Sequence, residues 1–119
     1  MATINQSMQE LLTLDGAVCC ALVDSSSGMI LGQSGTGVDM EVAAAGNTEV
    51  VRAKLKTMRA LGLSDVIEDI LITLGKQYHI IRPMARKEGL FIYLVLDKSK
   101  SNLALARRKT QEVEKDLIV

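Results

Sequence analysis

Residues 17–31 have the sequence AVCCALVDSSSGMIL, and this stretch indicates the class of fold. Residues 17–23 are all small or apolar, which is typical of a buried strand. Residues 24–28 have the composition of a turn, because Gly28 can adopt a positive φ. Residues 29–31 then begin a second apolar segment. The stretch therefore predicts a β-hairpin.

The sequence predicts a helix on each side of this hairpin. Upstream, apolar residues recur at helical spacing over residues 4–12. Downstream, Asp39 can cap a second helix that runs to about Leu61 and stops at Gly62. The clearest core stripe of this second helix is Val51, Leu55 and Met58.

The rest of the chain predicts further strands and a last helix. Residues 66–74, 77–83 and 90–96 are predicted strands separated by short turns, so neighbouring strands should be antiparallel. The last helix carries an apolar stripe of Leu103, Ala106, Thr110, Val113 and Leu117. The predicted order is α-β-β-α-β-β-β-α, an α+β fold with a five-stranded antiparallel sheet and helices on both faces.

The bulk composition favours one cytoplasmic domain over residues 1–119. The chain has 119 residues, and its 14 Lys and Arg balance its 14 Asp and Glu. A neutral chain has no long-range field that would attract nucleic acid or an anionic membrane. The N-terminus has no basic flank followed by an apolar run, so no signal peptide is expected.

Two segments carry more apolar surface than one small core explains. The first half of the second helix, residues 42–50, is small or apolar around more than one face. Small side chains also allow another helix to approach closely. The strand predicted at residues 66–74 has no proline, and as an open edge it would invite pairing with another chain.

The sequence shows no constellation of catalytic or metal-binding residues. The glycine-rich loop from Gly32 to Gly37 lacks the lysine that closes a phosphate-binding loop, so a flexible connector is favoured there. His79 is the only histidine, and no metal-ligand spacing surrounds it. Cys19 and Cys20 are adjacent in an apolar strand, where thiols are usually inert. No catalytic residue, metal or cofactor is therefore predicted.

One basic segment has two interpretations. Arg52, Lys54, Lys56 and Arg59 lie on the second helix. A solvated helix face is the favoured interpretation, and a binding patch for an acidic partner is the alternative.

Five short motifs together resemble the roadblock/LC7 domain family. Near the N-terminus these are LLTLDGAV at residues 11–18, ALVD at 21–24 and GMIL at 28–31. Near the C-terminus they are LVLD at residues 94–97 and NLALAR at 102–107. The resemblance covers nearly the whole chain, and the predicted order of elements also agrees with it.

The resemblance implies a profilin-like or longin-like sandwich with the first and last helices on one face and the long helix on the other. It also implies dimers in which the third strands pair edge to edge and the long helices pack together. Members of this family bind small Ras-like GTPases or scaffold larger assemblies, and none is a self-sufficient enzyme.

The prediction is a non-enzymatic homodimer that regulates or scaffolds a small Ras-like GTPase of a bacterial type. The predicted dimer residues are Val42, Ala45, Gly46, Val50, Val66, Ile70 and Ile72. Arg52, Lys56 and Arg59 are predicted contacts for the GTPase. Two alternatives stay open: a structural scaffold with no GTPase partner, and a small-ligand or nucleotide sensor that uses the Gly32 to Gly37 loop.

Overall fold

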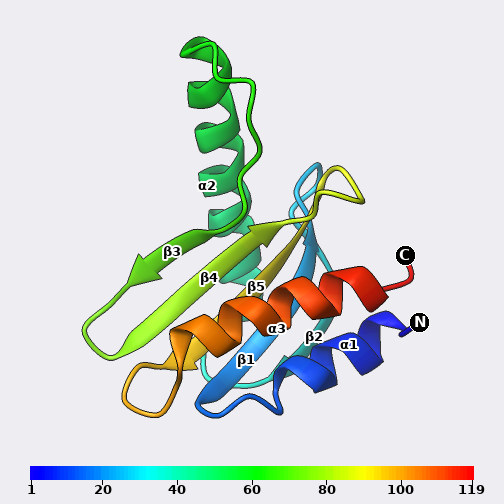
Figure 1. The fold of residues 1–119 in the computed structure, drawn as a ribbon, viewed down its shortest axis with the longest axis vertical. Coiled ribbons are helices and arrows are strands. Elements are labelled where there is room, and N and C mark those ends of the chain that lie inside the picture. Colours follow the sequence, from blue (N-terminus) through cyan, green and yellow to red (C-terminus); the bar gives the residue numbers. More distant parts are fainter.

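The computed structural model describes residues 1–119 and confirms the predicted order of elements (Figure 1). The elements are α1 (Ile4–Leu11), β1 (Ala17–Asp24), β2 (Met29–Gly35), α2 (Met40–Ala60), β3 (Ile70–Thr73), β4 (Gln77–Pro83), β5 (Leu90–Asp97) and α3 (Leu103–Asp116).

The sheet has five strands in the order β2-β1-β5-β4-β3, and every neighbouring pair is antiparallel. The two most apolar strands, β1 and β5, are adjacent, and five of the eight residues of β1 and six of the eight residues of β5 are buried. Strands β2 and β3 form the two edges. The predicted hairpin of β1 and β2 is confirmed, with Asp24 opposite Met29 at its turn.

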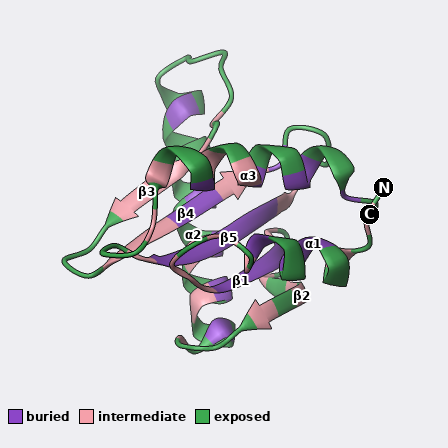
Figure 2. Cartoon of the chain, turned by 60° about the horizontal axis from the view of Figure 1, so that its bottom comes forward, coloured by how far each residue is buried: buried purple, intermediate pink, exposed green.

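The helices divide between the two faces of the sheet, as predicted. Helices α1 and α3 lie side by side over one face, and α2 lies behind the other (Figures 1 and 2). Each face has its own hydrophobic cluster, of 12 buried residues under α1 and α3 and of 10 under α2. Cys20 points into the first cluster and Cys19 into the second, because neighbouring strand residues face opposite ways.

Helix α2 begins and ends where the sequence predicts. The Asp39 side chain accepts a hydrogen bond from the Val42 N–H at 3.2 Å, and Gly62 follows the last turn with φ of +71°. The far half of α2 extends well beyond the sheet (Figure 1), so Leu55 is exposed rather than part of the core. No helix combines the length and the apolar character that crossing a bilayer requires.

The predicted loop from Gly32 to Gly37 is wrong over its first part, because β2 continues to Gly35 and pairs with β1. The glycines there allow close packing. A Cβ on Gly32 would lie 2.3 Å from Ile4 Cγ2, and one on Gly35 would lie 2.4 Å from the Val18 carbonyl oxygen. The segment is therefore a packed edge strand, which removes the flexible loop that a ligand sensor would need.

The third strand is shorter than predicted, because β3 begins at Ile70 and Val66 lies outside it. The residues before β3 are held by hydrogen bonds from side chains and not by pairing with another strand. Arg82 Nη1 donates to the Glu68 carbonyl oxygen at 2.9 Å, and Arg107 Nε binds the Asp69 carboxylate at 3.0 Å. Val66 is 70% exposed.

Candidate interaction surface

One stripe of α2 faces away from the sheet and is apolar. Val42, Gly46 and Val50 follow one another at four-residue spacing, so they share one side of the helix. Val42 is 67% exposed and Val50 is 38% exposed. We call these three residues the α2 stripe.

Gly46 has no structural role within the chain. It lies in the interior of a helix, where glycine costs about 1 kcal/mol relative to alanine. A Cβ at this position would meet no atom within 4 Å. Only another molecule can therefore use the close approach to the helix backbone that Gly46 permits.

Ala45 does not belong to the α2 stripe. Its Cα is 3.9 Å from the position that a Cβ on Gly28 would take, so Ala45 lies over the turn between β1 and β2. The side chain of Ala45 is exposed, and it lies three residues from Val42 along the helix.

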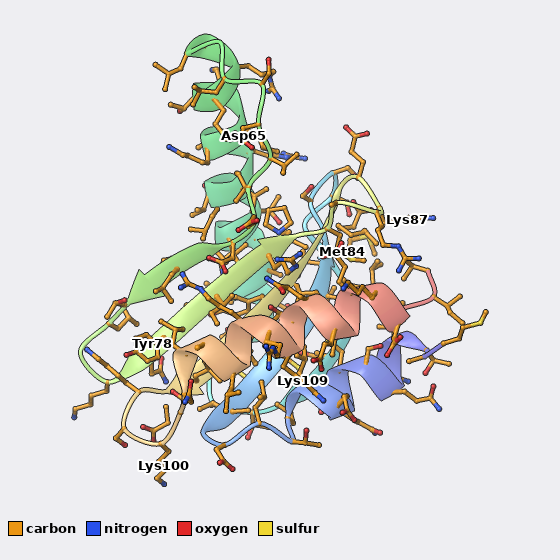
Figure 3. All side chains as sticks on the ribbon, viewed as in Figure 1. Asp65, Tyr78, Met84, Lys87, Lys100 and Lys109 are labelled. Atoms are coloured by element: carbon orange, nitrogen blue, oxygen red, sulfur yellow. The ribbon has the colours of Figure 1, made fainter.

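The far half of α2 and the segment after it form an apolar projection that the sequence did not reveal. Within residues 52–60 only Met58 is buried. Residues 61–69, which we call the return segment, run back along the helix; Figure 3 shows Asp65 in this position. The exposed apolar side chains of the projection are Leu55, Leu61, Leu63 and Val66. A leucine on each side of Gly62 was the only sequence signal.

Strand β3 is an open edge of the sheet. Ile70 and Ile72 are half-buried and pack against the cluster under α2. The Leu74 N–H donates to the Gln77 carbonyl oxygen at 2.8 Å, which closes the turn to β4. Because backbone groups alternate in direction along an antiparallel strand, those of Leu71 and Thr73 point outward from the edge.

The predicted GTPase contacts Arg52, Lys56 and Arg59 share one side of α2, because they are spaced four and three residues apart. Arg52 Nη2 donates to the Ser26 carbonyl oxygen at 2.6 Å, which ties its guanidinium to the turn between β1 and β2. The side chains of Lys56 and Arg59 are exposed on the projecting half of the helix.

His79 is part of a small polar cluster between the sheet and α2. Its Nδ1 is 3.0 Å from the Tyr93 hydroxyl, and its Nε2 is 2.9 Å from Gln77 Oε1. Burial lowers the pKa of His79 and raises the pKa of Tyr93. In the sheet His79 lies directly opposite Ile72 of the open edge strand.

The Cys20 thiol is buried in the cluster under α1 and α3. Burial raises the pKa of the Cys20 thiol to about 12, and its Sγ donates to the Met8 carbonyl oxygen at 3.2 Å. A thiol in this state is a poor nucleophile, because the thiolate is the reactive form. No group of three or more His, Cys, Asp or Glu side chains could hold a metal ion.

Comparison with solved structures defines the class of fold. The chain has the roadblock/LC7 fold: it is similar to the roadblock/LC7 domain from Streptomyces avermitilis with a TM-score of 0.82, at 11% identity, over 96% of this chain and 93% of that one. Neither a family sequence model nor a curated protein matches the chain.

Two further similar structures are of MglB, which is described as a gliding protein. MglB from Thermus thermophilus has a TM-score of 0.79 at 15% identity, over 92% of this chain and 81% of that one. MglB from Myxococcus xanthus has a TM-score of 0.75 at 14% identity, over 94% of this chain and 85% of that one. At these identities the likeness establishes the fold.

Proposed function

We propose that this chain is a non-enzymatic cytoplasmic adaptor, a single domain that forms a homodimer and binds a small Ras-like GTPase. The observation that carries the dimer is the α2 stripe, in which Gly46 leaves room that no atom of this chain uses. An exposed apolar stripe and an open strand edge are both covered when a second copy packs against them.

The proposed dimer joins the α2 stripe to the edge of β3. Ile70 and Ile72 are half-buried against the hydrophobic cluster under α2, so the edge strand and the helix belong to the same face of the sheet. The exposed leucines of the projection extend this surface beyond the sheet. A two-fold axis is the simplest symmetry for such a contact.

The GTPase is proposed from the family resemblance and from charge. Arg52, Lys56 and Arg59 give the projecting half of α2 a basic side that differs from the α2 stripe. Since helical spacing separates the two sides, a dimer could keep the basic side free for an acidic partner.

A pull-down tests the GTPase proposal. The immobilised chain is offered small Ras-like GTPases encoded near its gene, each loaded with GDP or with a non-hydrolysable GTP analogue. We expect one GTPase to be retained, and we expect the Lys56→Glu/Arg59→Glu variant to lose it while the Lys100→Glu control keeps it. Retention of none would favour the alternative of a structural scaffold without a GTPase partner.

A further inference from the structure

Helix α2 and its capping residue divide their charges between the two halves of the helix. Residues 39–50 carry three acidic side chains and no basic one, and residues 51–60 carry four basic side chains and no acidic one. These side chains are Asp39, Glu41 and Glu49 in the first half and Arg52, Lys54, Lys56 and Arg59 in the second. None of them takes part in an ion pair within the chain. The division suits the dipole of a single helix, and it makes two copies of the helix complementary when they run in opposite directions.

Gly46 determines where two α2 helices can come closest. The distance between packed helices depends on the side chains at the contact, and Gly46 has none. The α2 stripe has a valine four residues before Gly46 and another four residues after it. A two-fold axis places the point of closest approach at the same residue of both helices. In a homodimer that packs through the α2 stripe, Gly46 must therefore face its own twin.

We propose that the two α2 helices cross in antiparallel directions, with Gly46 facing its twin and Val42 of each copy packed against Val50 of the other. This register rests on the proposed homodimer. An antiparallel crossing centred on residue 46 sets residue 42 of one copy against residue 50 of the other, so both contacts beside the centre are apolar. A parallel crossing would instead bring the two acidic halves together and the two basic halves together.

Lys54 is the basic residue that this register uses. It follows Val50 at the spacing of the α2 stripe, and each residue turns the helix by about 100°. Lys54 therefore lies on the opposite side of the stripe from the proposed GTPase contacts, which stay outside the crossing.

The antiparallel crossing brings Lys54 of each copy close to Asp39 of the other. Lys54 is eight residues after Gly46 and Asp39 is seven residues before it, and both side chains are exposed. Asp39 Oδ1 accepts from the Val42 N–H at 3.2 Å, which leaves Oδ2 for the ammonium of the other copy. The crossing thus has apolar contacts near its centre and an ion pair at each end.

Cysteine cross-linking tests the register. Under mild oxidation Gly46→Cys should form a disulfide with its twin, because the two residues face each other. Val42→Cys and Val50→Cys should each remain largely uncross-linked alone, since neither position faces its own twin. A mixture of these two variants, with an affinity tag on one, should give a cross-link between tagged and untagged chains that is several-fold more abundant than either homodimeric one. The wild type is the control and should not cross-link, because Cys19 and Cys20 are buried.

Lys54→Glu tests the charges at the ends of the crossing. It places a second carboxylate near Asp39 at both ends, so the dissociation constant measured by sedimentation velocity should rise several-fold. The rise should shrink in high salt, because both side chains are exposed. Lys100→Glu, which changes an exposed lysine before α3, should leave the dissociation constant unchanged. An unchanged constant in Lys54→Glu would overturn the pair of Lys54 with Asp39.

The outcomes separate the register from the dimer itself. If the wild type is a dimer that Val42→Lys dissociates, but the mixture of Val42→Cys and Val50→Cys cross-links no better than each variant alone, the register is wrong and the dimer stands. Strong cross-linking of Val42→Cys alone and of Val50→Cys alone would show a parallel crossing and would also overturn the register. A wild type that is monomeric throughout would overturn the dimer, and the register with it.

Discussion

The two faces of the sheet differ in how completely this chain covers them. Under α1 and α3 the core is closed by the molecule's own side chains. Lys109 pairs with Glu10 across the two helices, and Arg82 pairs with the buried Glu114. Under α2 the near half of the helix covers the sheet, and the far half extends past it (Figure 1).

This difference indicates which face of the sheet is suited to bind a partner. The core under α1 and α3 is covered by helices of this chain, so changes in that core should alter folding and leave association unchanged. The α2 face leaves Val42, Gly46 and the open edge of β3 uncovered, so changes there should alter association and leave folding largely unchanged. Variants on each face test this contrast.

The largest effect is expected on the closed face, from Glu114→Ala. The Glu114 residue is 3% exposed, and its carboxylate accepts from Arg82 Nε at 2.7 Å and from the Ala85 N–H at 3.0 Å. Removing one partner of a buried pair leaves the other charge uncompensated. We expect the free energy of unfolding in urea to fall by about 3 kcal/mol or more at fixed protein concentration.

Glu112→Ala is the matched control for this variant, since Glu112 is an exposed glutamate on the same helix. It should change the free energy of unfolding by less than about 0.5 kcal/mol. Equal effects of the two variants would mean that the pair of Glu114 with Arg82 does not close this face.

Val42→Lys should have the next largest effect, and on association. A charge in the centre of a packed helix contact costs about 2 kcal/mol or more, which is roughly 30-fold in the dissociation constant. Sedimentation velocity measures this change. Leu105→Lys is the control, because Leu105 is also apolar and 55% exposed but lies on α3. Equal weakening by both variants would contradict the assignment of the interface to α2.

Gly46→Ala should act in opposite directions on folding and on association. Alanine stabilises a helix interior by up to about 1 kcal/mol relative to glycine. In a monomeric Val42→Lys background, thermal unfolding should therefore shift upward. In the otherwise wild-type chain the added methyl should separate the two helices and weaken the dimer several-fold. A tighter dimer would show that no helix approaches Gly46 closely.

The smallest expected effect is on the pH dependence of folding stability. Burial lowers the pKa of His79 in the folded chain from its ordinary value of 6.5, so protonation favours unfolding. The stability that neutral His79 contributes is present above about pH 6.5 and is lost as the pH falls toward the lowered pKa. Urea unfolding between about pH 7.5 and 5.5 should show a smaller loss of stability in His79→Gln than in the wild type. An equal loss of stability with falling pH in both chains would contradict the assignment of this pH dependence to His79.

Local patterns were sufficient to predict most of the fold. The hairpin of β1 and β2, strands β4 and β5, and both ends of α2 depend on apolar runs, turn residues and caps that are close together in sequence. The end of β2 was wrong for a nonlocal reason. Gly32 and Gly35 have the composition of a loop, but they are needed because Ile4 and Val18 approach them closely.

The candidate surface was predictable in part. The apolar character of residues 42–50 was visible in the sequence, but the position of Ala45 over the turn at Gly28 was not. The beginning of β3 depended on Arg82 and Arg107, which come from other elements and hold residues 68 and 69. Leu61 and Leu63 were missed because helical periodicity does not show where a helix passes the end of a sheet.

Light scattering of the purified wild-type chain at micromolar concentrations measures whether the uncovered α2 face binds a second copy. We predict a mass of twice the 12.9 kDa chain, because the α2 stripe and the edge of β3 are covered only in a dimer. A mass of 12.9 kDa at every micromolar concentration measured would contradict this prediction.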